Sequence, residues 1–229
     1  MKSLYLLIDV ASFAIPFLYS FEKKRIHFIG QWRAILYGLM AMSLVFIPWD
    51  ILFTSKGVWG FNDRYILGIK ISGLPLEEYL FFFLIGFCCL FVYETMNYFI
   101  KNKLNEGICR KLCFIISVSD ILIAIVFTNK YYTLTALGLT GLAILIILWF
   151  VRDFSWSKFL TGYAFSFIPF MVVNGILTGS FISEPIVWYQ DDHNLGYRLG
   201  TIPVEDSQYM MLMMLIMVFG YEKMKKKSI

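Results

Sequence analysis

Two pairs of adjacent acidic residues stand at matching places in the chain, each two positions after a proline and at the start of a long apolar run. A fixed offset of 128 positions carries Pro75 to Pro203 and the first acidic pair to the second. The four acids are Glu77, Glu78, Glu205 and Asp206. A helix dipole stabilises carboxylates in a first turn by roughly 0.3–1 kcal/mol each, but low dielectric and a close like charge favour the neutral acid. At least one of the four is therefore expected to keep its proton at neutral pH and to have a functional role.

Aromatic side chains accompany both acidic pairs at helical spacing. Phe81 and Phe82 lie one turn beyond the first pair, and the same offset places Tyr209 at the position of Phe81 in the second copy. Proline is favoured at the first helical position because its missing N–H would be unpaired there. Pro75 is therefore expected at that position, with the acids in the first turn and the aromatic rings one turn deeper.

Other polar residues interrupt apolar sequence in the first half of the chain. Asp9 lies inside the first apolar segment, where ionisable groups are costly and usually functional. Asp50 follows the second apolar segment and opens a loop in which Trp59 and Asn62 stand among glycines. Interfacial anchoring explains single Trp and Tyr residues. The concentration of Trp, Asp and Asn in this loop instead indicates a segment folded back over a site.

The surrounding chain has the composition of a membrane protein. Of its 229 residues, 59% are hydrophobic and only 16% are charged, which is more apolar surface than a soluble domain of this length can bury. Hydropathy predicts an all-α membrane protein with seven transmembrane helices at about Leu4–Tyr19, Ala34–Trp49, Leu76–Tyr98, Leu112–Phe127, Tyr132–Val151, Phe159–Leu177 and Val204–Gly220. The Lys and Arg residues are scattered between these spans, so no nucleic acid is expected as a partner. Two histidines and four cysteines without zinc spacing predict no metal site.

The distribution of positive charge predicts the orientation in the membrane. Fourteen Lys and Arg residues lie in the loops after the first, third and fifth spans and in the C-terminal tail, against six on the other side. Positive residues favour the cytoplasm, so the C-terminus is expected inside and the N-terminus outside. The long loops Asp50–Leu74 and Thr178–Ile202 then lie outside with both acidic pairs. The four lysines between Lys223 and Lys227 are interpreted as an anchor at an anionic leaflet.

The repeated motif divides the chain into two halves. Residues 1–98 hold the first three spans, residues 99–130 a linker helix, and residues 131–229 the last three spans. Four crossings separate equivalent spans, so the halves are predicted to be parallel repeats related by an axis along the membrane normal. Sites tend to form at the interface of such repeats. Both acidic pairs are therefore expected to meet there at one depth.

These motifs together resemble the integral-membrane lycopene cyclases. The resemblance rests on Pro75-Leu76-Glu77-Glu78-Tyr79-Leu80-Phe81-Phe82, on Trp49-Asp50 with Gly57-Val58-Trp59-Gly60-Phe61-Asn62, and on Pro203-Val204-Glu205-Asp206-Ser207-Gln208-Tyr209. It covers essentially the whole chain. In this family the two halves occur as separate subunits, as one fused bacterial or archaeal chain, or as the cyclase part of fungal bifunctional enzymes. The chain resembles the fused form. The resemblance therefore implies that the protein lies in a bacterial or archaeal cell membrane.

The resemblance implies a redox-neutral isomerisation in which the open ψ-ends of lycopene close into six-membered rings, giving γ-carotene and then β-carotene. An acid protonates C2 of the end group, the C5=C6 double bond attacks the resulting cation at C1, and C6 loses a proton. The implied catalytic residues are Glu77, Glu78, Glu205 and Asp206, with the largest effects expected at Glu78 and Glu205. The implied substrate-binding residues are Asp9, Asp50, Trp59, Asn62, Phe81, Phe82 and Tyr209.

The resemblance also implies the partners of the protein. Lycopene or a related linear carotenoid and membrane lipid are expected, and other carotenoid-pathway enzymes are candidates. The other cyclase type uses a flavin in a Gly-rich dinucleotide fold, and this chain has no G-x-G-x-x-G, so no cofactor is expected. Relatives also cyclise elongated C50 carotenoids, and the motifs leave both that substrate and the ring type, β, ε or γ, open.

A small membrane transporter is the alternative from another class, because three-plus-one-plus-three parallel repeats are also the plan of small sugar transporters. Those families carry a Pro-Gln signature, and this chain has no Pro-Gln pair. A retinal photoreceptor needs a lysine in its last span, and Val204–Gly220 contains none. A prenyltransferase would need a third acid after Asp191 and Asp192, where Leu195 stands instead.

Overall fold

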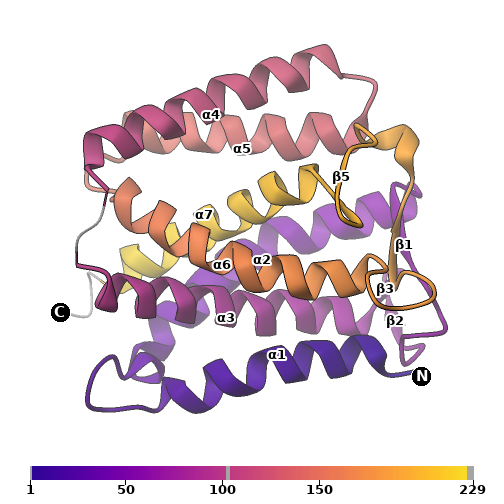
Figure 1. Cartoon of the computed structure of the whole chain (residues 1–229), viewed down its shortest axis with the longest axis horizontal. Coiled ribbons are helices and arrows are strands. Elements are labelled where there is room, and N and C mark those ends of the chain that lie inside the picture. The colour runs from indigo at the N-terminus through magenta and orange to yellow at the C-terminus, as the bar shows by residue number, and fades with distance from the viewer. Residues whose placement is uncertain (1, 102–103, 226–229) are drawn as a thin grey trace.

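The structure is a computed structural model that describes residues 2–101 and 104–225, and these residues form seven α-helices. The helices are α1 (Leu4–Ser20), α2 (Trp32–Ser55), α3 (Leu76–Phe99), α4 (Glu106–Val126), α5 (Tyr131–Phe150), α6 (Trp156–Leu177) and α7 (Glu205–Lys225). They lie alongside one another. The N-terminus and the short strands lie at one end of the bundle, and the C-terminal end of α7 lies at the other (Figure 1). Lys226 and Lys227, on which the predicted tail anchor partly rests, lie outside the described residues.

Among the described residues, four segments are long and apolar enough to cross a membrane. They are Phe28–Ser55, which contains a short 3₁₀ helix η1 (Phe28–Gln31) and α2, and the helices α3, α5 and α6. α1 is apolar but shorter, at 17 residues. Large apolar side chains face outward, among them Leu44 and Trp149, both 71% exposed. Such a surface suits lipid better than water. The prediction of an all-α fold of membrane type is confirmed at this level.

In the described ranges, three short antiparallel strand pairs close the end of the bundle where the N-terminus lies (Figure 1). Strand β1 (Trp59–Phe61) pairs with β4 (Val187–Tyr189), so the two long loops are joined to each other. Gly60 lies opposite Trp188, and a Cβ at position 60 would lie only 2.3 Å from the Trp188 ring. Glycine at position 60 therefore lets the two loops approach.

Two hairpins lead into the helices that begin with acidic pairs. The first joins β2 (Lys70–Ile71) to β3 (Leu74–Pro75) and precedes α3. The second joins β5 (Arg198–Leu199) to β6 (Ile202–Pro203) and precedes α7. The two hairpins have the same register, shifted along the chain by 128 positions.

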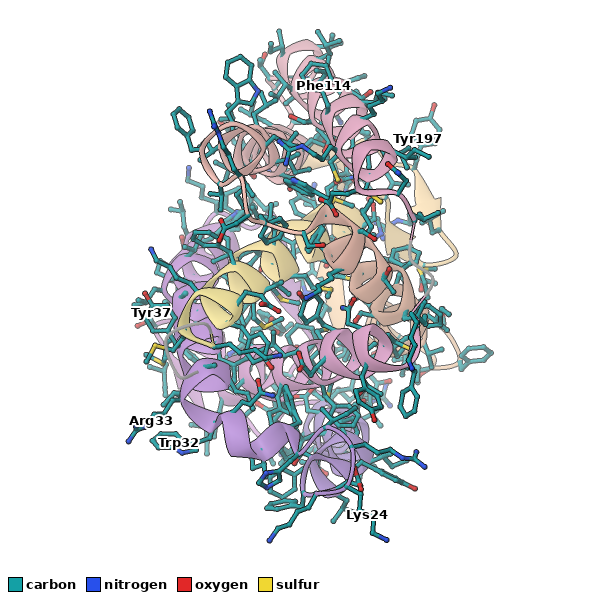
Figure 2. The ribbon with its side chains drawn as sticks, turned by 90° about the vertical axis from the view of Figure 1, so that its left-hand side faces the viewer. Lys24, Trp32, Arg33, Tyr37, Phe114 and Tyr197 are labelled. Carbon is teal, nitrogen blue, oxygen red and sulfur yellow. The ribbon has the colours of Figure 1, made fainter. Side chains whose placement is uncertain are left out.

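The helices form two groups around α3 and α7. α1 and α6 pack along α3, α2 and α5 pack along α7, and α4 packs mainly on α5. Seen from the end opposite the strands, α3 lies between α1 and α6 (Figure 2). α2 and α7 are especially close, because a Cβ added to Gly38 would lie 2.6 Å from the backbone oxygen of Met217. Small residues permit such close helix packing in membrane proteins.

Several predicted boundaries differ in the structure: α4 begins at Glu106, six residues before the predicted Leu112, and α7 ends at Lys225, five residues after the predicted Gly220. α2 continues past Trp49 to Ser55, so Asp50 lies on the helix and not in the loop. Hydropathy predicted that the span ends before Asp50, because a carboxyl group is polar. In the structure, hydrogen bonds to the Asp50 carboxyl group within the protein allow the helix to continue. Pro75 occupies the N-cap of α3, with extended dihedrals, because it also ends strand β3. Both acidic pairs lie in the first turn of their helices, as predicted.

Candidate active site

The two acidic pairs each contribute one residue to a single cavity at the strand end of the bundle. Glu78 from α3 and Asp206 from α7 line this cavity together, and its empty space is about 1220 Å³ when the part open to the surroundings is included. Its other walls come from α1, α2, α5 and α6 and from strands β1 and β4. One site thus receives an acid from each half of the chain.

The first half supplies two carboxyl groups in contact. Glu78 is 8% exposed and Asp50 is 2% exposed, and their side chains lie within hydrogen-bonding distance of each other. The Tyr5 hydroxyl donates to Glu78 Oε2, and Trp59 Nε1–H donates to Asp50 Oδ1 at 2.5 Å. The salt bridges found among the described residues all lie elsewhere. Two carboxyl groups so close repel each other when both are charged, which favours a state with one proton between them.

The second half supplies one carboxylate surrounded by hydrogen-bond donors. Asp206 accepts from the Tyr132 hydroxyl at 2.5 Å, from Asn174 Nδ2 at 2.7 Å and from the Tyr189 hydroxyl at 3.0 Å. Burial, with the Asp206 charge beside it, raises the pKa of Tyr189 well above its ordinary value, so this strand residue stays a donor. Hydrogen bonds donated to a carboxylate favour its charged, proton-accepting form.

The two clusters are built alike but differ at one position. Tyr5 in the first turn of α1 and Tyr132 in the first turn of α5 bond to the acids of α3 and α7. Asp50 near the end of α2 contacts the acid of α3, whereas Asn174 near the end of α6 contacts that of α7. Because an amide replaces a carboxyl group, only the first cluster can share a proton between two acids.

The other member of each acidic pair is fully buried and faces away from the cavity lining. Glu77 Oε1 accepts the Leu67 N–H at 2.6 Å, and Glu205 Oε1 accepts the Leu195 N–H at 2.7 Å. Thr133 also donates to Glu205, at 2.6 Å. Consecutive residues on a helix point about 100° apart, so one acid of each pair faces the cavity and the other fixes the loop before it.

Aromatic rings form much of the remaining wall near the acids. Trp59, Phe81 and Tyr209 line the cavity, and the ring centroids of Trp59 and Tyr209 are 6.2 Å apart. Phe82 lies behind this wall, 6.2 Å from the ring of Phe46. Aromatic faces attract cations, so the wall suits a transient positive charge.

Two further residues predicted to bind substrate, Asn62 and Asp9, also do not line the cavity. Asn62 Nδ2 donates to Glu184 at 3.2 Å and to the Pro185 carbonyl at 3.4 Å, so it joins the two long loops. Asp9 is fully buried, and neither of its carboxyl oxygens has a hydrogen-bond partner among the described residues. It lies near enough to Glu77 to interact with it electrostatically.

The residues that donate hydrogen bonds to Glu78 and Asp206 were not among the predicted site residues: Tyr5, Tyr132, Asn174 and Tyr189. One signal for the first two was present. Tyr5 and Tyr132 each stand at the start of the first apolar segment of their half. They are 127 positions apart, one fewer than the offset of 128 between the two acidic motifs. As a whole, the site can deliver a proton from one wall, accept one at the other, and stabilise positive charge between them. No group of three or more His, Cys, Asp and Glu side chains in the described parts of the chain is placed to hold a metal ion.

Comparison with known proteins gave one finding. A family model described as lycopene cyclase matches the chain over residues 2–96 and 129–224. Each matched segment contains one acidic pair, and α4 lies between the two segments. No curated protein and no solved structure matches the chain.

Proposed function

Since the chain belongs to the lycopene cyclase family, we propose that it closes the ψ-end groups of lycopene, or of a related linear carotenoid, into six-membered rings. The reaction is an isomerisation without redox change, and it gives γ-carotene and then β-carotene. The observation that supports this best is the single cavity in which a carboxyl pair faces a hydrogen-bonded carboxylate across aromatic rings. These are the groups that proton-initiated ring closure requires.

In this proposal the Asp50–Glu78 pair is the acid. It delivers its shared proton to C2 of the end group and leaves a tertiary cation at C1. The C5=C6 electrons attack that cation, so the C1–C6 bond forms and the positive charge moves to C5. Asp206 then accepts the proton from C6, which restores the C5=C6 double bond in a β-ring. One C–H bond forms and one breaks, so no oxidant or reductant takes part.

The surrounding residues position these groups and protect the cation. Trp59 and Tyr209 present aromatic faces, each of which attracts a cation by roughly 0.5–2 kcal/mol. Glu77 and Glu205 act as positioning residues, because they fix the loops that precede the two acids. The largely apolar lining of the cavity disfavours water, which would otherwise trap the cation as an alcohol.

The proposal includes seven membrane spans in two parallel repeats, with the N-terminus outside and the C-terminus in the cytoplasm. Backbone hydrogen bonds between the long loops support the repeat. The Asn62 N–H donates to Ile186 O at 2.8 Å, and the Gln190 N–H donates to Val58 O at 2.9 Å. The two donors are 128 positions apart, and so are the two acceptors, so the two bonds are equivalent under the repeat. This is expected if the axis that relates the two halves passes through the β1–β4 pair.

The proposed activity is tested by expressing the chain in a bacterium that accumulates lycopene and identifying the pigments by chromatography. We expect lycopene to be replaced by cyclic carotenoids, and the protein purified into lipid vesicles to do the same without added flavin or nicotinamide. Unchanged lycopene, with the protein shown to be inserted in the membrane, would contradict the proposal.

A further inference from the structure

The cavity extends well beyond the acids as a groove along α3. Its lining on α3 runs from Glu78 to Val92, which at about 1.5 Å per residue is about 21 Å of helix. We name the far part of this space the tail groove. Its lining residues are Ser12 and Pro16 from α1, Cys88 and Val92 from α3, and Ser166 and Pro169 from α6. None of the six is a charged residue, so the groove suits an apolar chain.

The tail groove opens sideways, toward the surface that faces lipid. α1 and α6 each pack against α3 but make few contacts with each other, and α3 is visible between them in Figure 2. Cys88 and Val92 at the floor are half-buried, and Pro169 at the rim is exposed. Beside the rim, Ile168 is 64% exposed on the outer face of α6. An apolar molecule in the lipid can therefore reach the groove without crossing water.

The sequence of both rims keeps this space open. Pro16 and Pro169 lie inside α1 and α6, and each removes a helical hydrogen bond, which bends a helix. Pro16 leaves the Ser12 carbonyl without its helical donor, and the Cys88 thiol donates to that oxygen at 3.5 Å. On the other rim, the small side chain of Ser166 is buried, and its hydroxyl has no hydrogen-bond partner among the described residues.

In the described part of the chain, the lining of this cavity has no matching extension on the opposite side of the bundle. The residue 128 positions after Val92 is Gly220 on α7. A Cβ at Gly220 would lie 3.3 Å from the Cα of Gly38 on α2, so these two helices are in close contact there. α2 thus occupies the place where a second groove would run. Within the described residues, the lining of this cavity extends to the depth of Val92 only on the side of α1, α3 and α6.

We propose that the tail groove binds the polyene chain of the carotenoid, which enters sideways from the lipid between α1 and α6. This inference rests on the proposed function and adds the path and position of the substrate. The reacting end group lies between Glu78 and Asp206, and the chain follows α3 toward Val92. The groove follows about 21 Å of a hydrocarbon layer about 30 Å thick. The far end of a long polyene is therefore held away from the acids, and one end group reacts at a time.

The test fills the groove far from the acids and compares two substrates. Ser166 lies eight residues before Asn174 on α6, about 12 Å along the helix. A truncated polyene with the same ψ-end group and a chain shorter than this does not reach position 166. In Ser166→Phe we expect lycopene turnover to fall about tenfold or more, while turnover of the truncated polyene stays near the wild-type value. Val172→Phe, at a lipid-facing position of α6 that is 61% exposed, is the matched control and should leave both rates unchanged.

A second variant, Ser12→Phe, fills the groove from the opposite wall and replaces the first if Ser166→Phe does not insert in the membrane. We expect the same selective loss of lycopene turnover. Undiminished lycopene turnover in the inserted variants would overturn the tail groove, as would an equal loss for both substrates. A wild-type protein that converts neither substrate would instead overturn the proposed function.

Discussion

Glu78→Gln is expected to slow ring closure by about 10²–10⁴-fold, the usual contribution of a general acid. The amide has nearly the same shape and still offers an oxygen to the Tyr5 hydroxyl, but it cannot hold the proton shared with Asp50. Asp50 then has no second carboxyl group with which to share a proton, and the hydrogen bond from Trp59 favours its charged form, so this wall of the cavity loses its proton donor. The rate is measured by chromatography of carotenoids from the purified variant in lipid vesicles supplied with lycopene.

The matched control is the neighbouring residue. Glu77→Gln makes the same chemical change one position earlier and keeps an oxygen for the Leu67 N–H, so we expect a rate near that of the wild type. Equal losses of rate in both variants would mean that the substitutions damage the fold at the start of the helix. The loss could then not be assigned to a missing proton donor. A wild-type rate in Glu78→Gln would remove the Asp50–Glu78 pair from the mechanism.

The second large effect is expected at Asp206→Asn, with a loss of about 10²-fold or more in ring closure. An asparagine cannot accept the C6 proton, and the hydroxyls of Tyr132 and Tyr189 lose a charged acceptor. Because one cavity serves every end group, the first and second closures should slow together. The measurement is the rate of appearance of monocyclic and bicyclic carotenoid in the same vesicle assay.

Glu205→Gln is the control for this variant, because Glu205 holds the loop at Leu195 and does not line the cavity. We expect it to retain most of its activity. A loss confined to the second closure in Asp206→Asn would contradict a site shared by both closures, and so would a larger loss in Glu205→Gln than in Asp206→Asn.

Much of this arrangement was visible in the sequence because it depends on local signals. A proline followed by two acids and an apolar run places both pairs in first helical turns. The shared offset also indicated that the two halves are built alike. What the sequence did not decide is which acid of each pair faces the cavity. That depends on how the whole helix is rotated against its neighbours, so Glu205 was expected to matter more than Asp206.

Asn174 was missed for a different reason. Asp50 and Asn174 hold equivalent places, but their separation is 124 positions, whereas the motif offset is 128. The stretch from Asn174 to Val187 is four residues longer than the one from Asp50 to Trp59, so a fixed offset does not reveal the match. Tyr5 and Tyr132 act through contacts between helices, which hydropathy does not report.

The central claim is that one composite site closes each end group in a separate event. A time course of the wild-type protein in vesicles loaded with lycopene tests it most directly. The account predicts that monocyclic γ-carotene appears first, rises, and then declines as bicyclic β-carotene accumulates. Bicyclic product from the earliest time points, with no monocyclic stage, would contradict it.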